Sequence, residues 1–327
     1  MSALSLLIYP LTFVTFPDFL PINIFDTKFS GIPSWNFTDM TVVNTLARNF
    51  YLLPDCKTAN KKPRDDEDRH QLVLGVWHVL PNSTSQRLIS ENRTSPQDMA
   101  KSLGEGDEPV MVFFHGRGTN RPSQARFYNT MAGINFHVLA IDWRGFGDST
   151  GEPTEDGLND DSHAIYSYAR KMAPNKEIIV LGQSLGTQVG PRLVRDLSKE
   201  GIPPRALILT AGFTNVHDIF VFMFTNTSAS NVDSFFNASL NAAMKRADLK
   251  FETDSVIKGV TCPILIVTNT YDFAVPNELS RKLRDSALSA NRNVTYVEIS
   301  DPSVGHSVHL SSQLPAIIQS FLGEKFD

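Results

Sequence analysis

Short apolar runs alternate with longer segments of helical spacing along most of this chain. Seven runs have the length and composition of buried strands, at residues 72–79, 110–114, 138–141, 178–181, 206–209, 264–267 and 294–299. Five segments place apolar residues three or four positions apart and predict helices, at residues 124–131, 157–172, 188–197, 278–288 and 313–322. This alternation predicts an α/β fold whose central sheet is mostly parallel and flanked by helices.

Two regions depart from the alternation. Residues 1–70 are rich in phenylalanine and proline and show no periodicity, so we expect an irregular, membrane-proximal segment ahead of one α/β domain over residues 71–327. Residues 213–251 form an insertion that is too long for an ordinary connection and is rich in phenylalanine. We expect this insertion to be a cap. Its phenylalanines either line an acyl-chain site or pack the cap onto the core.

The first 17 residues carry no charged side chain and are largely apolar. They are shorter than the roughly 20 residues of a membrane-spanning helix, and Pro10 interrupts them. They also lack the basic residues that open a signal peptide. We therefore expect a membrane-interface or hydrophobic-cover segment rather than a membrane span.

Composition narrows the classes of function. With 327 residues, of which 41% are hydrophobic, the chain can bury a large core. Its net charge of -5 and its dispersed lysines and arginines argue against a nucleic-acid-binding surface. The only two cysteines, Cys56 and Cys262, are far apart, which excludes a disulfide scaffold and shows no metal-ligand spacing. We expect no metal and no cofactor, and the spacing leaves open whether the two cysteines pair.

Glycosylation sequons are more frequent than chance predicts. Six asparagines precede a non-proline residue and then Ser or Thr: Asn36, Asn82, Asn92, Asn226, Asn237 and Asn293. Their number favours a lumenal or secreted domain. The alternative is that they are ordinary polar loop residues of a cytosolic enzyme.

The segment around Ser184 carries the strongest chemical motif. The apolar run 178–181 leads directly into Gly182-Gln183-Ser184-Leu185-Gly186, and a helical pattern follows. Gly-x-Ser-x-Gly between a strand and a helix is the setting in which serine becomes a nucleophile. Any Cβ at Gly182 or Gly186 would crowd the adjoining strand and helix, which explains both glycines. We predict that Ser184 is the nucleophile.

A serine nucleophile needs a base and an orienting acid, expected in the order Ser, Asp or Glu, His. Asp272 follows the strand 264–267, and His306 follows Gly305 beyond the strand 294–299. Carboxyl ends of parallel strands meet at one edge of a sheet, where ligands bind. We favour Asp272 over Asp301, which shares a loop with the histidine. We favour His306 over His309 because it stands nearer the strand end.

Backbone donors for an oxyanion are predicted on a second loop. The apolar run 110–114 ends in His115-Gly116-Arg117-Gly118. In serine hydrolases with this order of strand, turn and helix, one backbone N–H of the oxyanion hole comes from such a loop and another from the residue after the nucleophile. We assign the donors to Arg117 and Leu185, and we expect His115 and Gly116 to support the loop. The charges within residues 142–149 are expected to brace a turn by an ion pair of their own.

These motifs resemble the α/β-hydrolase superfamily over residues 71–322. The matching positions are His115-Gly116-x-Gly118, Asp142-x-Arg-Gly-x-Gly-x-Ser149, Gly182-x-Ser-x-Gly186, Asp272 and His306. Four segments further resemble its branch of lysophosphatidylserine and monoacylglycerol lipases, at residues 75–81, 182–187, 203–209 and 213–215.

The resemblance implies an endoplasmic-reticulum enzyme with a lumenal catalytic domain and an N-terminal membrane anchor. Two departures stand out. The family's His-Gly-Asn is His115-Gly116-Arg117 here, which places a bulky cation near the acyl site. The membrane anchor is expected to be missing or truncated.

We therefore expect a metal-free serine hydrolase at a membrane surface. It would cleave carboxylic esters of lipids, either a lysophospholipid such as lysophosphatidylserine or a monoacylglycerol, through an acyl-enzyme. A peptidase or thioesterase with the same triad is one alternative, because fold and triad do not fix the leaving group. A non-catalytic binding protein that kept the fold is another.

Overall fold

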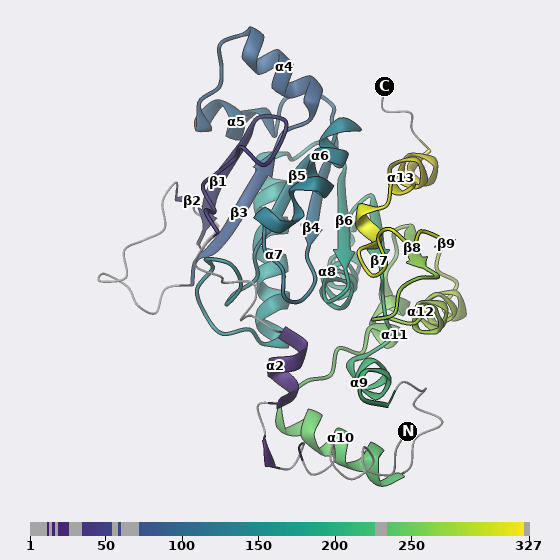
Figure 1. Ribbon diagram of the computed structural model, residues 1–327. Coiled ribbons are helices and arrows are strands. Elements are labelled where there is room, and N and C mark those ends of the chain that lie inside the picture. Colours follow the sequence, from purple (N-terminus) through teal and green to yellow (C-terminus); the bar gives the residue numbers. More distant parts are fainter. Residues whose placement is uncertain are drawn as a thin grey trace.

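The computed structural model describes residues 12, 15–16, 19–25, 35–53, 58–59, 72–225 and 234–323. These residues form a nine-stranded sheet with the strand order β2-β1-β3-β5-β4-β6-β7-β8-β9 (Figure 1). The strands are β1 (Ala47–Leu52), β2 (Thr58–Ala59), β3 (Leu74–Val79), β4 (Val110–Phe114), β5 (His137–Ile141), β6 (Ile178–Gln183), β7 (Ala206–Thr210), β8 (Ile264–Asn269) and β9 (Val294–Ile299). Neighbours from β5 to β9 pair in parallel, whereas β1, β2 and β3 pair antiparallel. The predicted α/β fold with a mostly parallel sheet is confirmed.

Helices cover both faces of the sheet. They are α2 (Phe19–Phe25), α4 (Asn82–Ser90), α5 (Pro96–Ser102), α6 (Ala125–Gly133), α7 (Glu155–Met172), α8 (Gly186–Lys199), α9 (Val216–Thr225), α10 (Ser234–Arg246), α11 (Thr253–Val256), α12 (Asn277–Ser289) and α13 (Leu314–Leu322). Side chains of α7, α8 and α12 share one hydrophobic cluster with Val112 of β4, and side chains of α6 and α13 share a second cluster with Met111 and Phe113. Successive residues of a strand face opposite sides, so this alternation shows a core on each face.

All seven predicted strands and all five predicted helices are present, with ends shifted by a few residues. The first 70 residues differ from the expectation. Strand β1 pairs with β3 along its whole length, so the expectation that residues 1–70 are irregular is wrong for residues 47–52. Polar residues at 48 and 49 interrupt the apolar run there. The Arg48 guanidinium is nevertheless buried, donates to Tyr168 Oη at 2.6 Å and lies over the Phe50 ring.

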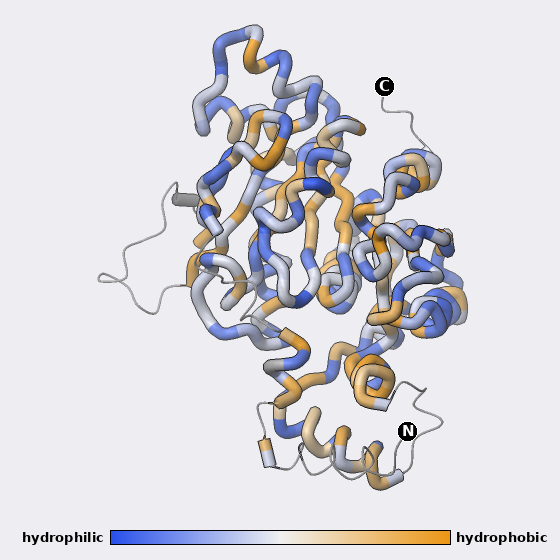
Figure 2. The backbone as a smooth tube through the Cα atoms, in the orientation of Figure 1, coloured by the Kyte–Doolittle hydropathy of each residue, from blue (hydrophilic) through white to orange (hydrophobic). Residues whose placement is uncertain are grey.

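The insertion between β7 and β8 contains α9 and α10, beyond the edge of the sheet at the bottom of Figure 1. Helix α9 is strongly hydrophobic (Figure 2), and its Phe220 is fully buried. The N-terminal helix α2 packs here too, with the Phe19 and Phe224 ring centroids 5.7 Å apart. Whether the insertion works as a cap stays a prediction, and its residues 226–233 lie outside the described residues.

Several other expectations concern the N-terminal region. Cys56 and most of the first 17 residues lie outside the described residues. Cys262 is buried and unpaired with any cysteine that the structure describes. Among the described helices, none combines the length and the apolar character needed to cross a bilayer.

Candidate active site

The chain makes a sharp turn at residues 182–186, the nucleophile elbow, where β6 ends and α8 begins. Ser184 has a φ of 51°, in the left-handed region that side chains other than glycine rarely adopt. Its N–H donates to the Thr210 carbonyl at the end of β7, at 3.0 Å. A Cβ at Gly182 would meet the Gly186 carbonyl, and a Cβ at Gly186 would meet the Phe114 carbonyl. The elbow therefore needs Gly182 to close on itself and Gly186 to fit against β4.

Two loops bring partners to Ser184. His306 Nε2 lies 2.9 Å from Ser184 Oγ, and His306 Nδ1 lies 2.8 Å from Asp272 Oδ2. The Asp272 side chain is fully buried, whereas the His306 side chain is 32% exposed. The structure thus brings together the three residues predicted as nucleophile, base and acid. In the tautomer with the proton on Nδ1, His306 donates to the carboxylate and accepts from the hydroxyl.

The Asp272 carboxylate is held by its own loop. Its Oδ1 accepts from the backbone N–H groups of Ala274 and Val275, both at 2.9 Å. These bonds fix the carboxylate and leave Oδ2 for the histidine. The acid is therefore oriented before any substrate arrives.

Asn269 is a positioning residue that the sequence did not single out. This fully buried last residue of β8 donates through Nδ2 to the carbonyls of Asp301 at 2.7 Å and Gly305 at 2.9 Å. Its Oδ1 accepts from the Asp301 N–H at 3.0 Å. One side chain thus ties the strand that precedes Asp272 to the loop that carries His306. The only sequence signal is an amide at the end of an otherwise apolar strand.

The alternative acid and base make other contacts. Asp301 accepts hydrogen bonds from Ser303 and Ser311 and caps its own loop. His309 is buried, with Nε2 2.6 Å from Gln124 Oε1, and packs against the rings of Phe113 and Phe127. In the part of the chain that the structure describes, neither side chain contacts Ser184.

The burial of His309 predicts a pH effect on stability. Burial lowers the pKa of His309 to about 3 from its ordinary value of 6.5. A folded-state pKa below the unfolded one gives stability that is present above about pH 6.5 and is lost as the pH falls toward 3. On unfolding below about pH 6.5 the His309 imidazole takes up a proton, and His309→Gln removes the group that does so. We expect the variant to be less stable near pH 7 and its deficit to shrink by about 1.4 kcal/mol per pH unit between pH 6 and 4. Urea unfolding of both proteins at several pH values measures the difference in their unfolding free energies. A difference that does not change with pH would contradict a lowered pKa of His309.

The predicted oxyanion loop passes directly beneath the nucleophile. A Cβ on Gly116 would lie 3.1 Å from Ser184 Cβ and would clash with Gln183 Oε1. The backbone N–H groups of Arg117 and Leu185 have no acceptor among the described residues. Both residues line the same cavity as Ser184. The two N–H groups are therefore available to an oxygen atom bound there, and their role as oxyanion donors stays a prediction.

His115 and a buried charge cluster support this loop. His115 Nδ1 lies 2.7 Å from the Gly116 carbonyl, and burial lowers the pKa of His115 to about 4, which keeps the ring neutral at pH 7. Asp142 accepts from the Arg121 N–H at 2.7 Å, and burial raises the pKa of Asp142 to about 7. The prediction of an ion pair within residues 142–149 is wrong, because Arg144 pairs with Asp161 of α7 at 2.7 Å.

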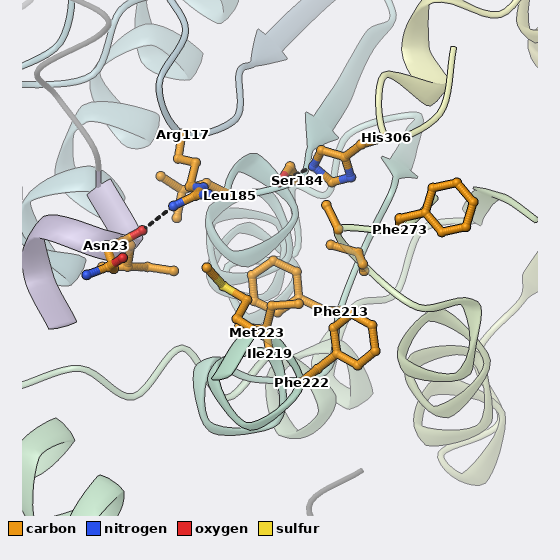
Figure 3. Close-up of a pocket in the computed structure, with 13 residues that line it drawn as sticks. Asn23, Arg117, Ser184, Leu185, Phe213, Ile219, Phe222, Met223, Phe273 and His306 are labelled. Carbon is orange, nitrogen blue, oxygen red and sulfur yellow. Dashed lines mark hydrogen bonds between the residues drawn. The ribbon is translucent and has the colours of Figure 1, made fainter. Parts of the chain in front are cut away.

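A cavity of about 330 Å³ opens beside Ser184 and His306 (Figure 3). Its walls come from α2, the loop after β4, the nucleophile elbow, α9 and the loops that carry Asp272 and His306. Phe213, Ile219 and Phe222 give it an apolar wall. The described residues contain no group of three or more His, Cys, Asp or Glu side chains placed to hold a metal ion.

Comparisons with known proteins show which proteins this chain is similar to. A family model described as serine aminopeptidase, S33, matches residues 107–256, which include the nucleophile elbow. The chain is 29% identical over 286 residues to the lysophosphatidylserine lipase ABHD12 of Danio rerio, covering 84% of this chain and 69% of that protein. It is 29% identical to Protein ABHD12B of Homo sapiens, covering 78% of this chain and 70% of that protein. Among solved structures, an alpha-beta hydrolase from Vibrio vulnificus superposes with a TM-score of 0.64 at 20% identity, covering 95% of this chain and 92% of that one.

Proposed function

Because this chain is a serine hydrolase with the α/β-hydrolase fold, we propose that it cleaves carboxylic esters of single-chain lipids, either lysophospholipids such as lysophosphatidylserine or monoacylglycerols. The main observation in support of the proposal is that Ser184 is hydrogen-bonded to His306 and lines an apolar cavity. Such a cavity buries an acyl chain and leaves the ester carbonyl beside the hydroxyl. The similarity to lysophosphatidylserine lipases supports the same substrate class.

The proposed reaction follows from the contacts. Ser184 Oγ attacks the ester carbonyl while His306 Nε2 accepts its proton, and Asp272 stabilises the imidazolium that forms. The N–H groups of Arg117 and Leu185 bind the oxyanion, each contributing about 3 kcal/mol in the transition state. His306 then protonates the leaving alcohol. Water activated by His306 finally hydrolyses the acyl-enzyme.

A peptidase is the second candidate, because the matching family model is described as a serine aminopeptidase. The same triad also serves thioesterases, and a binding protein could keep the fold. The cavity favours the lipid ester, since the described residues of its apolar wall offer no polar partner for a peptide backbone beyond the groups at its edge.

The test is a comparison of turnover by the purified full chain. We expect kcat/KM for a palmitoyl lysolipid to exceed that for a dipeptide amide by at least about 100-fold, since burial of an acyl chain contributes several kcal/mol. We expect it also to exceed kcat/KM for a palmitoyl thioester, which carries the same acyl chain and differs only in the leaving group. A higher kcat/KM on the amide or the thioester would overturn the proposal. Absence of turnover by a protein that a fluorophosphonate does not label would favour the binding protein.

We further propose that the enzyme works at the lumenal face of the endoplasmic-reticulum membrane. Four sequon asparagines are exposed, as glycosylation requires: Asn36, Asn82, Asn92 and Asn293. Phe273 at the cavity is 83% exposed, an apolar surface that a bilayer would cover. In a eukaryotic host we expect the protein to sediment with membranes and to gain mobility on treatment with an N-glycosidase. A cytosolic, unmodified protein would contradict this location.

A further inference from the structure

The cavity beside Ser184 is polar at one end only. Figure 3 shows Arg117 and Asn23 on one side of the nucleophile, and Ile219, Phe222 and Met223 of α9 across the cavity from them. Apart from His306, Arg117 is the one ionisable side chain among the described residues that line the cavity. An amphiphile fits such a site with its acyl chain along α9 and its polar group toward Arg117.

Among the residues that the structure describes, no acidic side chain neutralises the positive charge of Arg117. Its Nη1 donates to the Asn23 carbonyl in α2 at 2.6 Å. No carboxylate forms an ion pair with it within the described ranges, and no acidic residue lines the cavity there. An arginine presents five N–H donors in a planar fork, so most of them remain for a ligand. The Asn23 carbonyl holds the fork over the cavity without cancelling its charge.

The backbone position of Arg117 limits how far its guanidinium can lie from the ester carbonyl that Ser184 attacks. Its backbone N–H is the proposed oxyanion donor, so its side chain starts beside the carbonyl that Ser184 attacks. Gly116 lies directly against Ser184, which fixes the start of that side chain. An arginine side chain spans the few bonds that separate an acyl ester from the head group on a glycerol.

Resting on the proposed function, we propose that Arg117 is the binding site for an anionic group on the alcohol side of the ester, a phosphodiester or a carboxylate. Guanidinium groups bind both anions through paired hydrogen bonds, more strongly than neutral donors do. The enzyme therefore prefers anionic lysophospholipids to neutral monoacylglycerols. Arg117 acts here as a specificity-determining residue through its side chain, separately from its backbone N–H.

The test measures the ratio of kcat/KM for anionic lipids to kcat/KM for a neutral lipid. A ratio is needed because a substitution at position 117 can also lower the activity on every substrate by altering the oxyanion loop. Three lipids with the same palmitoyl chain are compared in neutral detergent micelles: lysophosphatidylserine, lysophosphatidylglycerol and monopalmitoylglycerol. We expect Arg117→Gln to lower kcat/KM for the anionic lipids relative to the neutral one by about tenfold or more. Arg117→Lys keeps a charge and should retain more of the ratio. Lys199→Gln, which removes an exposed charge at the far end of α8, should leave the ratio unchanged.

The outcomes separate the possibilities. A loss on both anionic lipids assigns the contact to phosphate, and a loss on lysophosphatidylserine alone assigns it to the carboxylate. An unchanged ratio in Arg117→Gln overturns the inference while the proposed function stands. If wild type hydrolyses none of the lipids, the proposed function itself fails. Should the variant not fold, the KM of wild type gives the answer, since it should rise with salt for the anionic lipids only, and a KM that salt leaves unchanged would overturn the inference.

Discussion

Ser184→Ala should reduce ester hydrolysis by at least about 10⁴-fold and should abolish labelling by a fluorophosphonate. Both effects have one cause. The proposed acyl-enzyme forms only through the Ser184 oxygen, and His306 Nε2 is hydrogen-bonded to that oxygen. The residual rate would come from substrate binding and from the oxyanion donors acting on water. Steady-state kinetics and gel detection of the labelled protein measure the two effects.

The control for this substitution is Ser90→Ala, on α4 and remote from the elbow, which should keep full labelling. Alanine at position 184 must adopt the same positive φ as serine, so the melting temperature should change by only a few degrees. Labelling that survives in a folded Ser184→Ala protein would show that another residue is the nucleophile.

Asp272→Asn should lower kcat by about 10⁴-fold with little change in KM, which steady-state kinetics on a lysolipid measures. The carboxylate Oδ2 accepts from His306 Nδ1 and stabilises the imidazolium, and an amide does neither well. The N–H groups of Ala274 and Val275 would still hold the oxygen of the introduced amide, which turns the amide nitrogen toward the histidine. The ring would then favour the tautomer that cannot accept the serine proton.

Asp301→Asn is the matched control, because this carboxylate caps its own loop through Ser303 and Ser311. We expect it to lower kcat by less than about tenfold, mainly through stability. Equal losses in the two variants, or a larger loss in Asp301→Asn, would mean that Asp301 orients the histidine.

The sequence predicts those parts of the site that can be recognised from residues adjacent in the chain. Gly182 is required by a steric contact with Gly186 inside the same turn, and the strand ends before Asp272 and His306 are visible as apolar runs. The steric contact of Gly186 is with Phe114 of β4, but Gly186 is recognised in the sequence as part of the same five-residue motif. The partners of Arg144 and Asn269 are not predictable in this way. Arg144, in the turn after β5, meets Asp161 of α7, and Asn269 at the end of β8 bonds to the loop after β9, so both contacts depend on tertiary packing.

The same reason explains the missed elements at the N-terminus. Strand β1 contains Arg48 and Asn49, which a pattern of apolar residues excludes from a core. Arg48 is buried because its guanidinium donates to Tyr168 of α7 and to His78 of β3, and neither contact can be read from β1 itself. Helix α2 has seven residues and is held by Arg117 and by the α9 rings, all distant in sequence.

Helices α9 and α10 join β7 to β8 without entering the sheet. Mutations can therefore accumulate between residues 213 and 251 during evolution while the backbone that carries Ser184 stays in register. Chimeras that exchange this segment between distant relatives would then inherit the chemistry of one parent and the substrate range of the other.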